Sequence, residues 1–122
     1  MRDAFLALID DDNLRLVILT GEGDRSFLGG ANLDELKELT PAKARAFLTL
    51  LSDANTAIRN LPVPVIARIN GVCIGAGLEV AASCDLRIAA SHVRLGMPEV
   101  ALDLPSVVES ALFPRLMGWG RM

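Results

Sequence analysis

The stretch 70–99 constrains the fold more than any other part of this chain of 122 residues. It follows a run of branched aliphatic side chains at 65–69, typical of a buried strand, and opens with the turn pair Asn70-Gly71. A short extended piece at 72–74 leads through Gly75 and Gly77 into residues 76–84, which predict a buried helix. Strands alternating with helices in this way indicate an α/β fold.

The rest of the chain continues the alternation. We expect strands at 14–20, 86–90 and 93–95, helices at 2–9, 32–39, 41–60 and 105–117, and a glycine-marked loop at 26–30. The helix at 41–60 follows Thr40-Pro41, a typical N-cap and first position, and its apolar residues recur at three- and four-residue spacing. The length fits one domain over residues 1–122.

Composition excludes several classes of protein. The chain is 52% hydrophobic but only 4% aromatic, with no Tyr, which predicts an aliphatic core. The net charge of −3 is scattered, so we expect no nucleic-acid partner, and no apolar run approaches the ~20 residues of a membrane span. Acidic residues follow the N-terminal apolar run too soon for a signal peptide, which predicts a cytoplasmic protein. Cys73 and Cys84 match no metal or redox spacing and are expected to be reduced and buried.

Two glutamates, Glu79 and Glu99, suggest acid/base chemistry, because one carboxyl group can give a proton while the other takes one. Glu79 lies at the start of the helix that follows the glycine turn, and Glu99 follows Met97-Pro98. Simpler interpretations exist for each. Glu79 alone would be a helix-start carboxylate that satisfies the helix dipole, and Glu99 alone would be a surface loop acid.

Backbone N–H groups near these acids could stabilise a negatively charged oxygen. The first turn of the helix that begins at Ala76 has free N–H groups, and the glycine turn lets a ligand approach them. A second small-residue loop, Gly29-Gly30-Ala31, could present another N–H group to the same oxygen. Alternatively, this loop is an ordinary glycine loop in which Asn32 or Asp34 caps the next helix.

Other site types fit less well. Gly75-Ala76-Gly77 matches only part of a dinucleotide-binding fingerprint, because Val80 stands where a third small residue is needed. His92, the only histidine, has no adjacent acid, so a Ser/His/Asp triad is not indicated. No group of His, Cys or acidic residues has metal-ligand spacing.

Three segments occur together in a known order: SFLGGANLDEL at 26–36, PVIARINGVCIGAGLEVAASCDLRIA at 64–89 and MPE at 97–99. This combination resembles the enoyl-CoA hydratase/isomerase (crotonase) family. The resemblance implies a crotonase-like (ClpP/crotonase) spiral of β-β-α units, here partial, and hydration or isomerisation of an acyl-CoA thioester of the kind used in fatty acid metabolism. It also implies a homo-oligomer, either a trimer or a dimer of trimers, and no cofactor, because coenzyme A is part of the substrate.

The resemblance also implies roles for single residues. The N–H groups of Ala31 and Ala76 would form the oxyanion hole for the thioester oxygen. Glu79 and Glu99 would hold the attacking water and exchange the proton at the alpha carbon. The acyl-CoA path would be lined by Ala31, Asn32, Leu33, Asp34, Gly75 and Ala76.

Several positions depart from the family pattern. Asn32 stands where the family usually has Asp, and Ala76 replaces a common Gly. Segment 104–112 replaces a glycine-rich helix start; its Glu109 is expected on a solvated helix face, with a third carboxylate near the site as the alternative. The family's first strand and C-terminal helical region lie outside the sequence, so we expect an incomplete core that exposes 111–113. A catalytically inactive fragment, or an acyl-CoA-binding or interaction module, is the alternative function.

Overall fold

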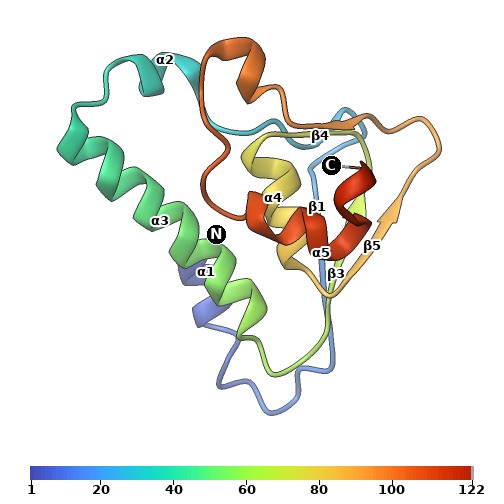
Figure 1. Ribbon diagram of the computed structural model, residues 1–122. Coiled ribbons are helices and arrows are strands. Elements are labelled where there is room, and N and C mark those ends of the chain that lie inside the picture. Colours follow the sequence, from blue (N-terminus) through green and yellow to red (C-terminus); the bar gives the residue numbers. More distant parts are fainter. Residues whose placement is uncertain (122) are drawn as a thin grey trace.

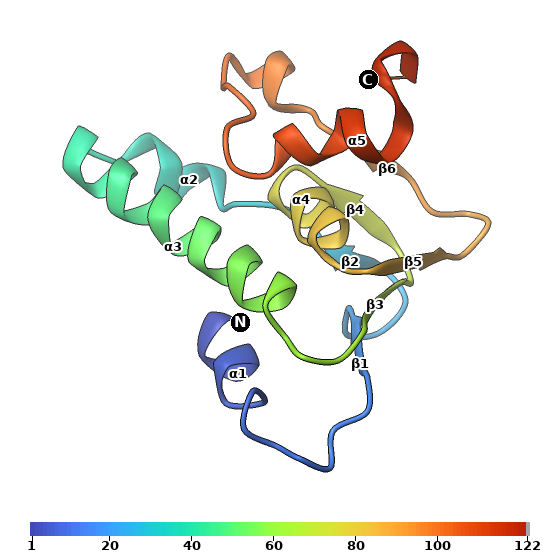
Figure 2. The ribbon, with the colours of Figure 1, turned by 60° about the horizontal axis from the view of Figure 1, so that its bottom comes forward.

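A computed structural model describes residues 1–121 and shows two small parallel sheets around a central helix (Figures 1 and 2). One sheet contains β1 (Val17–Thr20), β3 (Val65–Ile69) and β5 (Leu86–Ala89), in that order. The other contains β2 (Ser26–Leu28), β4 (Val72–Ile74) and β6 (Leu95–Gly96). Consecutive strands therefore alternate between the two sheets, and each neighbouring pair is parallel.

Helical segments follow each pair of strands. The helices are α1 (Arg2–Leu6), α2 (Leu33–Lys37), α3 (Pro41–Arg59), α4 (Ala76–Ser83) and α5 (Phe113–Met117). Three 3-10 turns complete the described part: η1 (Glu99–Leu102), η2 (Ser110–Leu112) and η3 (Trp119–Arg121). A strand in each sheet followed by a helical segment is the repeating β-β-α unit, so the predicted α/β class and spiral are confirmed. Across residues 1–121, no helix combines the length and apolar composition that crossing a membrane requires.

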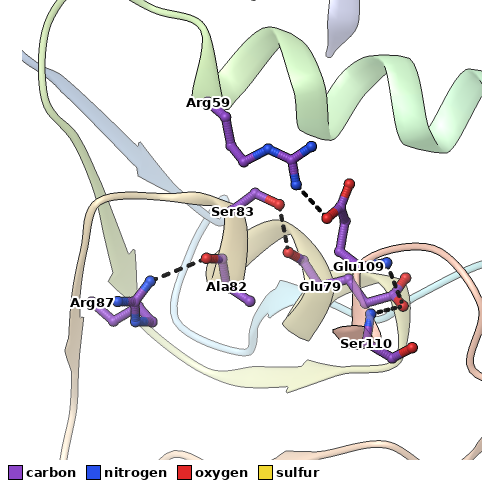
Figure 3. Close-up of polar contacts among 7 residues, drawn as sticks. All are labelled: Arg59, Glu79, Ala82, Ser83, Arg87, Glu109 and Ser110. Carbon is purple, nitrogen blue, oxygen red and sulfur yellow. Dashed lines mark hydrogen bonds and ion pairs between the residues drawn. The ribbon is translucent and has the colours of Figure 1, made fainter. Parts of the chain in front are cut away.

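Helix α4 lies at the centre of the fold, between α3 and the C-terminal segment (Figures 1 and 2). Most of its residues are buried, including Glu79. Gly77 is required at its first turn because a methyl group there would overlap the carbonyl oxygen of Leu28 in β2. At the other end, Arg87 donates to the last carbonyl groups of the helix, including that of Ala82 (Figure 3). Helix α4 is thus packed closely against β2 at its first turn and capped by Arg87 of β5 at its last turn.

The core differs from the prediction in its aromatic content. Phe5, Phe27 and Phe113 are all buried, so the core is not purely aliphatic. The expected exposure of 111–113 is wrong for Phe113, which lies in the first turn of α5, packed beside η2. The prediction for the cysteines is confirmed: Cys73 and Cys84 are free and buried, and burial raises the pKa of their thiols to about 11 and about 12.

Several predicted boundaries are also corrected. The N-terminal helix ends at Leu6 rather than residue 9, and Leu6 and Ile9 are exposed. The first strand begins at Val17 rather than residue 14, and residues 26–28 form strand β2 rather than a loop. The helix predicted at 105–117 is broken. The N–H groups of Glu109 and Ser110 donate to the side chain of Glu79 instead of to a preceding helical turn.

Candidate active site

A cavity of about 420 Å³ lies where the start of α4 meets α2, α3 and the segment 98–108. Both predicted glutamates, Glu79 and Glu99, line this cavity, although they come from different turns of the spiral. The glycine-rich segment before α2 and the glycine turn before α4 also line it. The structure therefore brings the three sequence motifs to one place.

Glu79 is held by the backbone of a distant segment. Its side chain projects from α4, the residue is 4% exposed, and Oε1 accepts hydrogen bonds from the N–H groups of Glu109 and Ser110, both at 3.1 Å (Figure 3). Burial raises the pKa of Glu79 above its ordinary value, the N–H groups of residues 108–110 oppose that rise, and the charge of Glu99 adds to it. Glu79 is in the first turn of α4, yet its carboxylate binds another segment rather than only its own helix dipole.

Glu99 is half-buried at the start of η1, across the glycine turn from Glu79. A methyl group on Gly75 would lie 2.8 Å from Glu99 Oε1, so this carboxylate sits directly against the turn. Its other oxygen, Oε2, is buried and has no hydrogen-bond partner within residues 1–121. A surface loop acid would be hydrated, so the simpler interpretation of Glu99 does not describe its position.

The two predicted N–H donors also line the cavity. Ala76 is the first residue of α4. Ala31 follows Gly30, and a methyl group added to Gly30 would lie 3.7 Å from the Ala76 nitrogen. Neither the Ala31 nor the Ala76 N–H donates a hydrogen bond to another residue in the described part of the chain. First-turn N–H groups without an internal partner are the groups that bind oxygen anions at helix starts.

The predicted acyl-CoA path is only partly on the cavity. Ala31, Leu33, Gly75 and Ala76 line it, but Asn32 and Asp34 do not. Asn32 is instead the N-cap of α2, where Oδ1 accepts a hydrogen bond of 3.0 Å from the Asp34 N–H. The Asp34 side chain points to solvent and forms an exposed ion pair with Lys37.

An apolar wall of the cavity was not identified from the sequence. The sequence predicted the apolar face of α3, but it gave no sign that the first half of this face would line a cavity. Leucines of α2 and of the segment after η1 complete the wall. The wall residues are Leu33, Leu36, Leu39, Ala44, Phe47, Leu48, Leu51, Leu102, Leu104, Val107 and Val108.

Glu109 is the clearest correction at the site. It was expected on a solvated helix face, but it is 7% exposed, and its carboxylate forms an ion pair with Arg59 (Figure 3). The prediction failed because residue 109 is drawn inward by its own N–H bond to Glu79, while Arg59 compensates its charge. Glu109 does not line the cavity.

The fold and the site define a β-β-α spiral protein with two carboxylates and two available amides on one largely apolar cavity. The family model described as enoyl-CoA hydratase/isomerase matches residues 1–119. The chain belongs to this family.

Individual relatives agree with this assignment. The crotonyl-CoA hydratase of Syntrophomonas wolfei is 40% identical over 121 residues, which are 98% of this chain and 46% of the relative. The short-chain-enoyl-CoA hydratase of Clostridium acetobutylicum is 41% identical over 91% of this chain and 43% of its own length. The crystal structure of an enoyl-CoA hydratase from Bacillus anthracis superposes with a TM-score of 0.92 and 36% identity, covering 98% of this chain and 47% of that one. The chain thus spans about half the length of the curated relatives it matches.

Proposed function

We propose that this protein hydrates or isomerises the double bond of an enoyl-CoA thioester through an enolate intermediate. The observation that carries the proposal is the single cavity lined by Glu79, Glu99 and the N–H-bearing residues Ala31 and Ala76. Hydratases acting on crotonyl-CoA and on short-chain enoyl-CoA are among its relatives, which supports the same substrate class here.

In this proposal the thioester oxygen accepts hydrogen bonds from Ala31 and Ala76. Adding a nucleophile to the β carbon moves negative charge onto that oxygen, and donors that are already oriented stabilise the charge without reorganising. Loss of one such donor typically raises the barrier by about 3 kcal/mol. The helix start at Ala76 adds the positive end of the α4 dipole to this stabilisation.

The two carboxylates handle the water and its protons. The water oxygen bonds to the β carbon and one water proton passes to a carboxylate, while a carboxyl group delivers a proton to the α carbon. The buried Oε2 of Glu99 supports this role, because a water molecule would satisfy it. The raised pKa of Glu79 brings its protonated form closer to neutral pH, as proton delivery requires. In isomerisation the same groups move a proton along the acyl chain without adding water.

The acyl group would lie along the apolar wall formed by α2, α3 and the segment after η1. Leucines, valines and Phe47 dominate that wall, and burial of each CH₂ group there contributes about 0.8 kcal/mol. The cavity therefore favours an uncharged acyl chain.

Hydration of crotonyl-CoA tests the proposal. We expect Glu79→Gln and Glu99→Gln each to lower kcat by about 10²–10⁴-fold, because each removes a proton-transfer group. The matched control is Glu22→Gln, the same substitution at an exposed turn residue, which should leave kcat unchanged. Equal rates in all four proteins would reject the assigned roles.

Binding measurements separate the alternatives. Calorimetry with butyryl-CoA would detect an acyl-CoA-binding module as tight binding in a protein without turnover. Binding of NAD together with no binding of coenzyme A thioesters would favour the dinucleotide-binding interpretation instead.

A further inference from the structure

We propose that the Arg59–Glu109 ion pair is a positioning device for Glu79. The pair fixes the backbone N–H groups of residues 109 and 110, and these hold one oxygen of the Glu79 carboxylate. The kinetic consequence rests on the proposed function, whereas the placement of Glu79 can be tested without it.

The pair joins two segments that are far apart in the sequence. Arg59 is the last residue of α3, and its guanidinium binds Oε2 of Glu109 (Figure 3). The Glu109 side chain is only 9% exposed, and that of Arg59 is 37% exposed. Neither residue lines the cavity, so neither touches substrate in the proposed reaction.

Glu109 makes contacts in two directions. Its carboxylate is bound to α3, and its N–H is bound to Glu79 on α4, with Ser110 adding a second N–H bond. Residue 109 is the N-cap of η2, but the residues before it, 104–107, have no regular secondary structure, so no helix or strand fixes it from the N-terminal side. The ion pair with α3 adds a constraint on that side.

The same contacts orient the Glu79 carboxylate. Oε1 accepts N–H bonds from both Glu109 and Ser110. With Oε1 held, the second oxygen has a defined direction for proton transfer. Misplacing a catalytic group by 1 Å can lower a rate by about 10²-fold, so small shifts of the 109–110 turn are expected to matter.

Stability alone is a weak reason for such a pair. An ion pair whose arginine is exposed to solvent typically contributes little to the free energy of unfolding. A positioning role instead predicts that the effect of breaking the pair depends on the presence of Glu79.

The kinetic experiment compares Arg59→Met in the wild-type and Glu79→Gln backgrounds. Arg59→Met should lower kcat for crotonyl-CoA by about 10- to 100-fold in the wild type, with KM changed by less than about twofold. In the Glu79→Gln background the same change should lower kcat no further, because the group it positions is gone. Arg59→Lys, which keeps the charge, should restore most of the activity.

Arg2→Met is the matched control, since the Arg2 side chain is 39% exposed and forms ion pairs with Asp3 and with Asp53 on α3, away from the cavity. It should leave kcat unchanged in both backgrounds. Equal losses from Arg59→Met in both backgrounds, or no loss in either, would overturn the proposal.

A titration of the Glu79 side chain by NMR tests placement without activity. Glu109→Met leaves Arg59 free to reach water, so this variant is the one expected to fold if Arg59→Met does not. The charged groups around Glu79 are Glu99, Glu109 and Arg59. Removing the negative charge of Glu109 would by itself lower the Glu79 midpoint, whereas loosening the two N–H bonds raises it.

A raised midpoint in Glu109→Met therefore supports the positioning role, and an unchanged or lowered midpoint overturns it. If Glu109→Met shows this shift but the wild-type protein does not hydrate crotonyl-CoA, the proposed function is rejected and the positioning role is retained. The two failures are thus distinguishable.

Discussion

Gly75→Ala is predicted to displace Glu99 without altering any titratable group. Gly75 has φ of +56°, and a methyl group added there would lie 2.8 Å from Glu99 Oε1. An ordinary van der Waals contact is at least 3.4 Å, so the carboxylate would have to retreat by about 0.6 Å. A retreat of this size moves Glu99 away from the cavity end of α4, where Glu79 also lies.

Two separate effects follow from this geometry. The positive φ should destabilise the alanine variant by about 1–3 kcal/mol, because L side chains are strained in that conformation. The shift of the carboxylate should lower kcat by roughly tenfold, given that a 1 Å misplacement can lower a rate about 10²-fold.

Thermal unfolding and crotonyl-CoA hydration separate these effects. Gly23→Ala is the matched control, because Gly23 also has positive φ, +69°, but nothing lies within 4 Å of an added methyl group. Both variants should lose stability, and only Gly75→Ala should lose kcat at a temperature where both are folded. A Gly75→Ala variant with full kcat, or a Gly23→Ala variant with the same kcat loss, would refute the reasoning.

Two further predictions follow from the electrostatics of the cavity. Burial raises the pKa of Glu79, so the stabilising contribution of its protonated form is complete below the ordinary value of 4.5 and is lost as pH rises through the raised pKa. The wild type should therefore lose stability between about pH 4 and about pH 8, whereas Glu79→Gln, which has no carboxyl group at this position, should not. The melting temperature of Glu79→Gln minus that of the wild type should thus increase over this range, and a constant difference would contradict the prediction. Of the described residues, none with a cationic side chain lines the cavity, whereas two glutamates do. An enoyl-CoA with a terminal carboxylate should thus have kcat/KM at least about tenfold below that of an apolar one of equal length, and equal values would argue against the placement of the acyl group.

Local sequence signals predicted the elements that depend on local interactions. Strands 65–69 and 72–74 were predicted with their observed bounds, and the helix at 41–60 was right to within one residue. The signals for these elements act over only a few residues, so they can be recognised in the sequence alone. They are the branched aliphatic runs, the Asn70-Gly71 turn and the Thr40-Pro41 helix start.

The segment 105–117 could not be predicted in the same way. Its conformation depends on hydrogen bonds from Glu109 and Ser110 to Glu79, which lies 30 and 31 positions earlier. The burial of Glu109 depends on Arg59, 50 positions away. Periodicity over one or two helical turns carries no information about partners at such distances.

The candidate site was predicted unevenly for a related reason. Family resemblance brought Glu79, Glu99, Ala31 and Ala76 together, and all four line one cavity. The apolar wall was missed because a helix face that packs on a core and one that lines a cavity have the same spacing of apolar residues. Asn32 was assigned to the acyl-CoA path, but its side chain forms the cap of α2.

The central claim is that Glu79 and Glu99 act as one unit on a single thioester. The most direct measurement is the crotonyl-CoA hydration rate of the wild type, Glu79→Gln, Glu99→Gln and the double variant. Groups that act as a unit are strongly non-additive, so the double variant should be at most about tenfold slower than the slower single variant. Losses that multiply in the double variant, or a single variant as fast as the wild type, would contradict the claim.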